Sequence, residues 1–314
     1  MAIFRPPQKK KGASKEFFTP LPVPIASINK AVPKLELWSY YDGHLKEDHI
    51  KVELKGDIHC LHTQGFFGRL VKTATQNDEP TEDEKSKLSI DCKGSDTSTN
   101  HDSCLNKISG HSSTIPTQHK QHETALAAKV EEILVLTYEE AFFLSYGLGC
   151  LFVKDYNGEN INIEQQWNIF CKRNMRFPVT YCAYHHFRSK GWVPRDGIRY
   201  GGDLVLYRKG PPYYHASYIV IIVSVDAETL QETVFREAKN RTFSWPTMSG
   251  QLRLATSVSK EVMLCHVVVP TKYLKSDSCD VSCLNNFQVK ETIVSRWIST
   301  KEREKELLDI DCDF

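Results

Sequence analysis

Tyr207 and His215 are two side chains capable of proton transfer that stand on either side of a Gly-Pro-Pro turn at 210–212. Alternating apolar residues before and after this turn predict strands over 203–209 and 215–225. Because a tight turn folds the second strand back on the first, the tyrosine and the histidine are expected near each other. A phenol and an imidazole in one place can accept and donate a proton during catalysis. Each residue alone is as readily explained by packing or by an ordinary hydrogen bond.

Basic residues are in excess around this pair. Between residues 185 and 215 there are six Lys or Arg and two Asp or Glu. The basic residues are Arg188, Lys190, Arg195, Arg199, Arg208 and Lys209. A local positive excess of this kind suits phosphate groups, although a solvated surface has the same composition. The segment is therefore a candidate for contact with a nucleic acid.

Several kinds of catalytic or cofactor site are missing from the sequence. It has no GxxxxGK[ST] phosphate loop, no GxGxxG, no GxSxG and no HExxH. None of the ten cysteines forms a CxxC pair, and Cys279 and Cys283 stand alone with three residues between them, so a zinc finger is not expected. Acidic residues are not clustered as a two-metal nuclease would require, so a metal-dependent nuclease is only the weaker alternative. We therefore expect neither a metal nor a cofactor.

The overall composition is that of a folded protein without a global field for a charged partner. The 314 residues are 40% hydrophobic and 11% aromatic, which favours about two packed domains. Forty Lys and Arg against 39 Asp and Glu give a net charge of +1, so a polyanion must bind at a local patch. Without a signal peptide or a run of 18 apolar residues, we expect an intracellular protein that is not inserted in a membrane. Lys9–Lys11 fit a nuclear-import signal or a solvated tail.

Aromatic residues are absent between Phe67 and Tyr138, and this gap marks a break in the folded chain. Most of it is rich in Ser, Thr, Asp, Asn, Gln and His, a composition that cannot bury enough apolar surface to fold. We expect an α/β (α+β) fold in which a small, split N-terminal domain is followed by a compact C-terminal domain with a mixed sheet. The expected parts are a flexible tail over 1–33, an N-terminal mixed α/β domain over 34–72 and 126–176, a disordered insertion over 73–125, and the C-terminal domain over 177–314.

Helix and strand signals support this division. Thr137 and Glu140 have the spacing of a capping box and begin a helix, which Gly147 and Gly149 end. Pro194 is expected to stop a later helix. Further helices are predicted over 163–174, 179–191 and about 246–255, and further strands over 49–54, 150–156, 260–270 and 287–299.

Three blocks of the C-terminal domain resemble a known family. The catalytic subunits of the eukaryotic tRNA-splicing endonuclease are closely similar to YHHFRSKGWVPRDGIRYGGDLVLYRKGPPYYHASY (184–218), SVSKEVMLC (257–265) and KETIVSRW (290–297). The likeness is greatest to the subunit that cuts the 5′ splice site. It extends more weakly to YEEAFFLSYGLGCL (138–151) and QGFFGRL (64–70). The resemblance implies a nuclease fold for the C-terminal domain.

The resemblance also implies a catalytic triad of Tyr207, His215 and Lys260. In the family the tyrosine takes the proton of the 2′-hydroxyl beside the scissile phosphate, the histidine protonates the leaving 5′ oxygen, and the lysine stabilises the phosphorane. This lyase-type cleavage leaves a 2′,3′-cyclic phosphate and a 5′-hydroxyl. An imidazole with a reference pKa of about 6.5 suits the acid role. A phenol with a pKa of about 10 needs a nearby cation, for which Lys260 is the candidate, unless Tyr207 only orients the hydroxyl. Three other tyrosines compete for the place of Tyr207: Tyr200, Tyr213 and Tyr214.

Substrate and partners follow from the same resemblance. Arg253 and Trp297 match the positions that hold an extruded intron base by cation–π stacking, with ordinary packing as the alternative role of Trp297. The implied substrate is precursor tRNA, and the implied partners are a second catalytic subunit and two structural subunits of a heterotetramer. The expected location is the nucleus, with the cytosolic face of an organelle as the alternative. The competing function is a non-catalytic structural or RNA-binding subunit of the same kind of complex.

Overall fold

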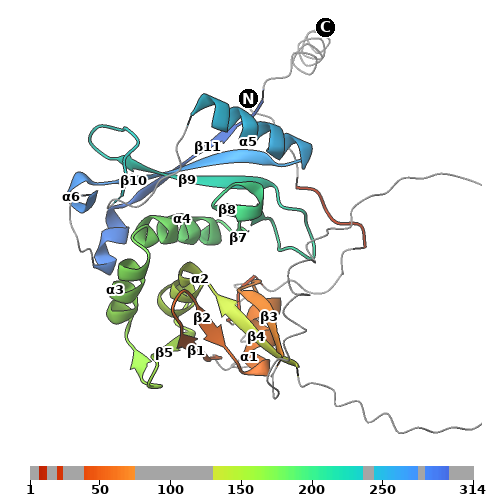
Figure 1. Cartoon of the computed structure of the whole chain (residues 1–314), viewed down its shortest axis with the longest axis vertical. Coiled ribbons are helices and arrows are strands. Elements are labelled where there is room, and N and C mark those ends of the chain that lie inside the picture. The colour runs from red at the N-terminus through yellow and green to blue at the C-terminus, as the bar shows by residue number, and fades with distance from the viewer. Residues whose placement is uncertain are drawn as a thin grey trace, which may run out of the picture. The chain divides into compact units, whose positions relative to one another are not determined.

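The protein is described by a computed structural model that covers residues 7–12, 20–23, 39–74, 130–235, 244–274 and 280–296. The chain divides into two compact units, one with residues 1–71 and 132–314 and one with residues 72–131. Only the two ends of the second unit are described. The first unit holds two mixed sheets and the helices packed on them (Figure 1).

The N-terminal domain is a mixed α/β domain, as expected. Its strands are β1 (Tyr41–Leu45), β2 (Ile50–Val52), β3 (Arg69–Ala74), β4 (Val130–Leu136), β5 (Leu151–Lys154) and β6 (Asn160–Ile161), in the sheet order β3-β4-β2-β1-β5-β6. Its helices are α1 (Lys55–Thr63), α2 (Tyr138–Phe142), which continues as a π-helical turn over Phe143–Gly147, and α3 (Ile163–Arg173). The interval 75–129, which includes most of the predicted insertion, lies outside the described residues.

The C-terminal domain is built on a five-stranded mixed sheet, which confirms the expected fold class. Its strands are β7 (Val193–Asp196), β8 (Leu204–Tyr207), β9 (Tyr218–Asp226), β10 (Glu261–Val269) and β11 (Gln288–Val294), in the order β11-β10-β9-β8-β7. Its helices are α4 (Phe177–Ser189), α5 (Trp245–Ser257) and the short α6 (Thr271–Leu274). The central pair β9–β10 is parallel and the other neighbouring pairs are antiparallel.

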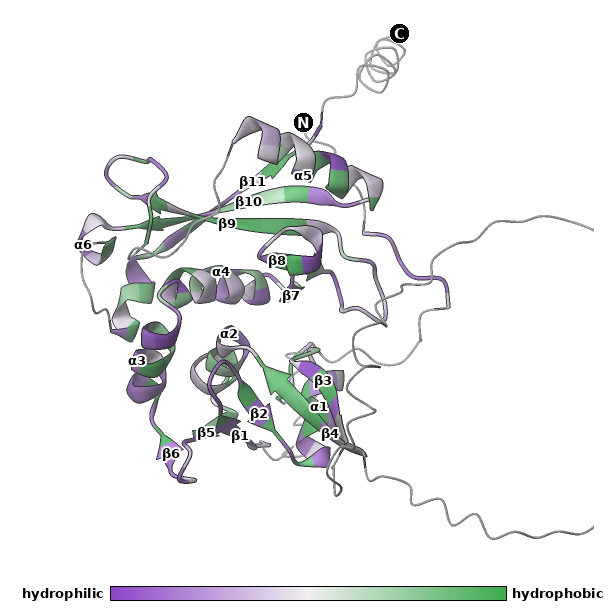
Figure 2. Cartoon of the chain, viewed as in Figure 1, coloured by the Kyte–Doolittle hydropathy of each residue, from purple (hydrophilic) through white to green (hydrophobic). Residues whose placement is uncertain are grey.

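Helices α4 and α5 cover opposite faces of this sheet (Figure 1). Strands β9 and β10 are hydrophobic along most of their length (Figure 2), as is typical of strands that are buried on both faces. Successive residues of β9 alternate between two cores: Val220 and Ile222 belong to the large core that includes α4, and Ile219 and Ile221 to a smaller core with Met248 of α5. The start of β9 is therefore held from both sides.

An aromatic cluster makes the two domains share one core. The ring of Phe142 on α2 lies 5.3 Å from that of Trp167 on α3 and 5.7 Å from that of Phe177 on α4, centroid to centroid. Tyr181 of α4 stands edge-on to Phe142 at 4.8 Å. Buried aromatic rings contribute large apolar areas, and tilted or edge-on contacts are their favoured geometry. The position of α4 is thus set by the N-terminal domain.

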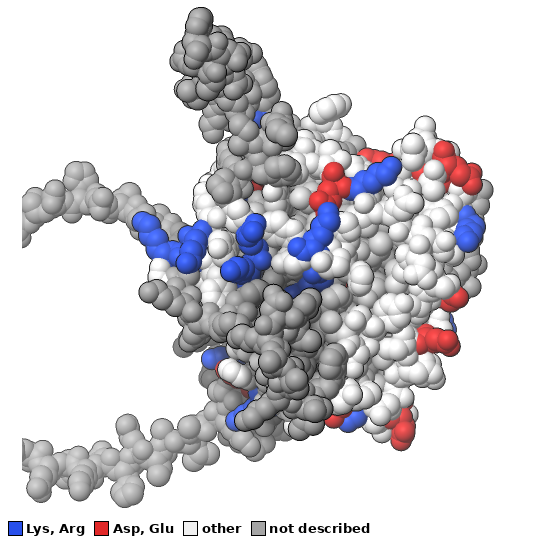
Figure 3. Space-filling view, turned by 180° about the vertical axis from the view of Figure 1, so that it is seen from behind, with Lys and Arg blue, Asp and Glu red and all other residues white. Residues whose placement is uncertain are grey.

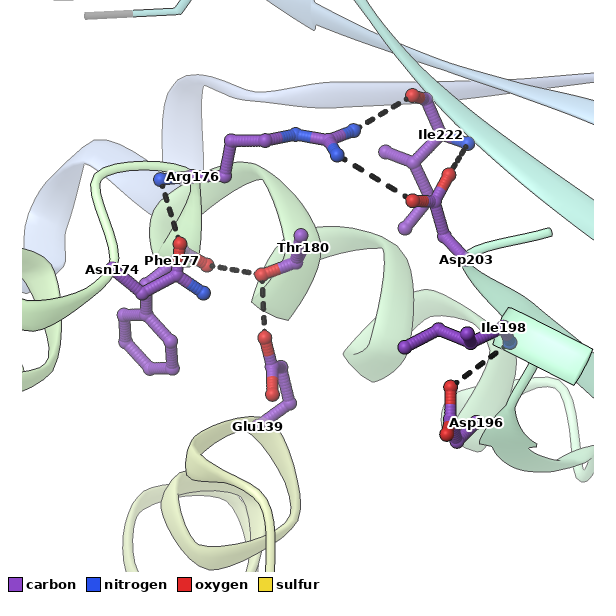
Figure 4. A network of polar contacts seen from close by, with 9 residues as sticks. All are labelled: Glu139, Asn174, Arg176, Phe177, Thr180, Asp196, Ile198, Asp203 and Ile222. Carbon is purple, nitrogen blue, oxygen red and sulfur yellow. Dashed lines mark hydrogen bonds and ion pairs between the residues drawn. The ribbon is translucent and has the colours of Figure 1, made fainter. Parts of the chain in front are cut away.

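Polar contacts fix α4 at the same junction (Figure 4). The Thr180 hydroxyl donates to Glu139 of α2 at 2.6 Å. Burial raises the pKa of Glu139, and the hydrogen bond from Thr180 opposes that shift. The Arg176 guanidinium lies 3.4 Å from Asp203 and donates to the Ile222 carbonyl at 2.9 Å, while the Asp203 carboxylate accepts from the Ile222 N–H at 2.7 Å. The beginning of α4 is thereby tied to both α2 and β9.

Strand β7 was not predicted from the sequence. Pro194 was expected only to stop a helix, yet it lies within β7 and stands opposite Leu206 of β8. Proline has no N–H to donate, but an edge strand leaves one side of its backbone unpaired, and β7 is the edge of its sheet. The proline at position 194 therefore prevented the prediction of β7, a strand that lies directly beside Tyr207.

The buried carboxylate of Glu140 joins the start of α2 to the segment before β3. The predicted capping box is confirmed: the Thr137 side chain accepts from the Glu140 N–H, and Glu140 Oε2 accepts from the Thr137 N–H at 3.0 Å. Its other oxygen, Oε1, accepts from the Gly68 N–H at 3.1 Å and lies 3.5 Å from Nη1 of Arg195 on β7. The Glu140 carboxylate thus accepts hydrogen bonds from the start of α2 and from the turn before β3, and it lies beside a guanidinium.

Replacing Glu140 by alanine is expected to lower the free energy of unfolding by about 3 kcal/mol. The change leaves two N–H groups and the Arg195 charge without their buried acceptor, and removing one partner of a buried ion pair is costly. Chemical denaturation followed by circular dichroism measures the effect. Glu159→Ala, at an exposed loop position, is the matched control with a change below about 0.5 kcal/mol. An equally small change for Glu140→Ala would contradict the role assigned to this carboxylate.

Candidate active site

The sheet topology places Tyr207, His215 and Lys260 at one edge. Strand β8 runs antiparallel to β9, and β9 runs parallel to β10, so the end of β8 and the starts of β9 and β10 meet. Tyr218 of β9 is the common neighbour, because it pairs with Leu206 on one side and with Glu261 on the other. Tyr207 therefore stands one residue beyond the first pair, and Lys260 one residue before the second.

His215 lies in the segment that runs between these two residues. Ser217, two positions later, donates its N–H to the Leu206 carbonyl at 2.9 Å, and its own carbonyl accepts from the Glu261 N–H at 3.0 Å. The His215 side chain is exposed, whereas those of Tyr207 and Lys260 are half-buried. The same end of the sheet thus carries an imidazole that is open to solvent and a phenol and an ammonium group that are partly desolvated.

Lys260 is positioned by the end of α5. Its backbone N–H donates to the Ala255 carbonyl at 2.8 Å, and its ammonium donates to the Val258 carbonyl at 3.2 Å. The ammonium also lies 4.8 Å from the centre of the Tyr200 ring, a cation–π distance. Burial lowers the pKa of Lys260. Tyr200, one of the tyrosines that compete for the place of Tyr207, is therefore the aromatic neighbour of the lysine.

The pKa of Tyr207 is raised, whereas the sequence-based mechanism called for a cation to lower it. Burial is the largest cause, and the nearby Tyr200 adds to it. The cation that opposes the shift is Arg195 rather than Lys260. Strand β7 pairs with β8, and Val193 of β7 stands opposite Tyr207. Arg195, two residues after Val193, is therefore close enough to affect the pKa of Tyr207. A phenol whose pKa is raised in this way is protonated at neutral pH.

Arg195 also connects the site to the N-terminal domain. Its guanidinium donates to the Phe66 carbonyl at 2.7 Å. Phe66 has a φ of +57°, a left-handed conformation that is uncommon for a bulky residue, and its ring stands edge-on to Tyr213 at 6.0 Å. A Cβ built on Gly210 would lie 2.3 Å from the Phe66 ring, so only glycine fits there. The turn at 65–68 therefore supports the loop that carries His215.

Three of the six residues in the predicted basic patch interact with other groups of the protein. Arg188 is buried, donates to the Gly65 carbonyl at 2.7 Å and lies 4.0 Å from the centre of the Phe67 ring. Lys190 forms a 2.8 Å ion pair with Glu291. Arg195 is engaged as described above. The sequence placed these three cations with the phosphate-binding candidates, because composition does not show which cations already have a partner. Arg199, Arg208 and Lys209 are exposed, as is Lys190.

The residues predicted for base recognition are placed only in part. Arg253 is exposed on α5, the helix that ends before Lys260. Trp297 lies outside the described residues. Within the described ranges no group of three or more His, Cys, Asp or Glu side chains is placed to hold a metal ion. No helix in that part of the chain is long and apolar enough to cross a membrane.

Both domains match models of one family. Residues 41–167 match the tRNA intron endonuclease N-terminal domain, and residues 177–273 match the tRNA intron endonuclease catalytic C-terminal domain. The fold and the site thus define a two-domain chain with a catalytic-type C-terminal domain. The chain belongs to the tRNA intron endonuclease family, which confirms the resemblance seen in the sequence at this level.

Similar proteins carry the name tRNA-splicing endonuclease subunit Sen2. The protein of Rattus norvegicus is 46% identical over 175 residues, which cover 56% of this chain and 36% of the relative. The protein of Gallus gallus is 45% identical over 178 residues, which cover 57% of this chain and 37% of the relative. A Sen2-2 protein of Arabidopsis thaliana is 33% identical over 178 residues, 57% of this chain and 66% of the relative. The matched region spans little more than a third of the first two relatives.

Gly210→Ala is expected to lower the free energy of unfolding by about 2–4 kcal/mol. The added methyl group meets the Phe66 ring, and the backbone φ of +114° is strained for any other residue. Gly158→Ala is the matched control, because Gly158 has a φ of +87° but open space around its missing Cβ. It isolates the backbone strain, which costs about 1 kcal/mol. Denaturation curves of both variants give the comparison, and equal losses would show that Phe66 does not press on the loop.

Proposed function

We propose that this chain is a catalytic subunit of a tRNA-splicing endonuclease that cleaves precursor tRNA at the 5′ splice site. The observation that carries the proposal is the placement of Tyr207, His215 and Lys260 at one sheet edge, within the region that matches the catalytic C-terminal domain. The similar proteins named Sen2 support the assignment to tRNA splicing. The choice of the 5′ splice site rests on the likeness of the segment 184–218.

The proposed reaction uses a nucleophile that RNA itself supplies. The 2′-hydroxyl oxygen attacks the adjacent phosphorus, the bond to the 5′ oxygen breaks, and the products carry a 2′,3′-cyclic phosphate and a 5′-hydroxyl. His215, whose side chain is exposed on the loop between β8 and β9, donates the proton that the leaving 5′ oxygen takes up. Lys260 stabilises the negative charge that builds up on the phosphorane. No metal-bound water is needed for this chemistry.

Tyr207 has an orienting role in this mechanism. Because burial raises its pKa, less than about 0.1% of the phenol is ionised at pH 7, the fraction expected for a free tyrosine. A neutral phenol is a weak base but a good hydrogen-bond partner for the 2′-hydroxyl. We therefore assign it to holding that hydroxyl in line with the leaving group, while the 2′ proton passes to water. Correct alignment of this kind accounts for much of the rate in phosphoryl chemistry.

Substrate and partners complete the proposal. Arg253 is exposed on α5 and is available to stack on an intron base together with Trp297. In the proposed assembly a second catalytic subunit and two structural subunits form a heterotetramer with this chain. Reconstitution with these partners, followed by mapping of the cut and chemical identification of the product ends, tests the function as a whole. Correct binding without cleavage would instead indicate a non-catalytic subunit.

His215→Ala is expected to slow cleavage at the 5′ site by about 10²–10⁴-fold, because the leaving oxygen loses its proton donor. Cleavage at the 3′ site, assigned to the other catalytic subunit, is expected to continue. Gel analysis of both cuts on one reconstituted complex measures the two rates. His59→Ala, at an exposed histidine of α1, is the control with unchanged rates. Full 5′ cleavage by the His215 variant would remove it from the mechanism.

Lys260→Ala is expected to lower the single-turnover rate at saturating enzyme by about 10²-fold, with a far smaller loss of RNA affinity. Its charge acts on the transition state more than on the bound phosphate. Lys260→Arg is expected to restore the rate only in part, since a planar guanidinium does not reproduce a compact ammonium. Lys272 provides a matched control, because its ammonium lies 4.6 Å from the Tyr273 ring centre in a similar cation–π contact. Weaker binding with a normal saturated rate would reduce Lys260 to a substrate contact.

A further inference from the structure

Residues 7–12, called the N-terminal arm here, lie against the loop that carries His215. Lys9 forms an isolated antiparallel bridge with Tyr214. The Lys10 N–H donates to the Tyr213 carbonyl at 3.0 Å, and the His215 N–H donates to the Gln8 carbonyl at 3.0 Å. These two hydrogen bonds flank the bridge as in a short antiparallel ladder. The arm is thus joined directly to the backbone of the proposed acid.

The register of the bridge determines which side chains share a face. Lys9 stands opposite Tyr214, and because side chains alternate along paired segments, Gln8 and Lys10 share the other face with His215. Lys9 and Lys11 are exposed, and Lys10 is half-buried. A lysine side chain is long enough to reach well beyond its own backbone position. The exposed Lys9 is therefore held beside the loop by backbone hydrogen bonds, with its side chain on the face opposite to that of His215, and the exposed Lys11 follows two residues later.

The arm and the loop together form a surface without acidic residues. The arm has the sequence PQKKKG, and the loop 208–217 has the sequence RKGPPYYHAS, in which Arg208 and Lys209 are both exposed. On the face shown in Figure 3, Lys and Arg side chains gather in a row in which Asp and Glu are few. Because the whole chain has a net charge of only +1, such a local concentration of cations determines where a polyanion binds.

We propose that the N-terminal arm is an RNA-binding element in which Lys9 and Lys11 contact backbone phosphates close to the scissile phosphate. The inference rests on the proposed function for its choice of RNA as the occupant. Lysine ammonium groups on an exposed strand suit phosphates as point charges and carry no sequence preference. Pairing with the loop keeps these charges at a fixed place relative to His215. The proposal thus gives a role at the site to two of the three lysines that also fit a nuclear-import signal.

The first test removes the two exposed charges. A Lys9→Gln and Lys11→Gln double variant of the full chain, reconstituted with its partners, is compared with the unaltered complex for binding of precursor tRNA between 50 and 200 mM salt. The slope of log affinity against log salt is expected to become shallower by about 1.5, since each lost phosphate contact removes about 0.7–0.9. Affinity at low salt is expected to fall about tenfold. Lys55→Gln with Lys172→Gln, at exposed positions on α1 and α3, is the control of equal charge.

The second test separates the pairing from the charge. Lys10→Pro and Lys10→Gln remove the same charge, but only proline also removes the N–H that donates to the Tyr213 carbonyl. If the arm works by being held at the loop, Lys10→Pro weakens RNA binding about threefold or more relative to Lys10→Gln. Equal affinities of these two variants would show that pairing is irrelevant and would overturn the proposal. An unchanged salt slope in the double variant would overturn it as well.

Outcomes for the arm are distinguishable from those for the proposed function. Binding and salt slope are measured without cleavage, so a complex that binds RNA through the arm but does not cut it contradicts only the catalytic assignment. A complex that cuts RNA normally while the double variant keeps its full salt slope contradicts only the arm. If the arm serves an acidic protein surface instead, the double variant weakens assembly of the complex while the salt slope for RNA stays unchanged.

Discussion

The buried carboxylate of Glu140 is the contact on which the arrangement of the site depends. It caps the start of α2, accepts from the Gly68 N–H of a turn and stands beside Arg195, so three segments far apart in sequence meet at one group. Arg195 in turn donates to the Phe66 carbonyl, and it is the cation that opposes the rise in the pKa of Tyr207. An unpaired charge at this depth would be strongly unfavourable. The electrostatics of the site are therefore linked to a helix cap in the other domain.

The loop with His215 has little regular structure of its own, and its order comes from neighbours. The Phe66 ring packs on it where Gly210 leaves room, and the N-terminal arm pairs with residues 213–215 by two hydrogen bonds. Both supports come from segments that precede the catalytic-type domain in sequence. A loop that is constrained at both ends and along its length keeps a side chain in place for proton transfer. The N-terminal domain and arm thus contribute to the site without supplying a member of the triad.

Local signals in the sequence were sufficient for much of the fold and indicated that Tyr207 and His215 lie near each other, whereas Lys260 was chosen from the family resemblance alone. The capping box at Thr137 depends on residues three apart and was predicted correctly. The two strands around the Gly-Pro-Pro turn were predicted from alternation, but the second begins at Tyr218 rather than at His215, so His215 lies in the loop before β9. The uses of Arg188 and Arg195 were missed, because their partners Gly65 and Phe66 lie more than a hundred residues earlier in the chain. Strand β7 was missed because its proline is tolerated only at an edge. Position in the folded sheet, rather than composition, decides these roles.

Burial shifts Tyr207 and Lys260 in the same sense, toward their neutral forms. The pKa of the phenol is raised and that of the ammonium is lowered, each chiefly by loss of water. For Tyr207 this favours hydrogen bonding over proton abstraction. In the proposed mechanism, an arriving phosphate supplies the negative charge that favours the protonated form of Lys260, and the scarcity of water strengthens that attraction as charge grows on the phosphorane. The Tyr200 ring gives the ammonium partial compensation before substrate binds. In this proposal, the same desolvation that makes an isolated charge unfavourable strengthens the interaction of the lysine with the transition state.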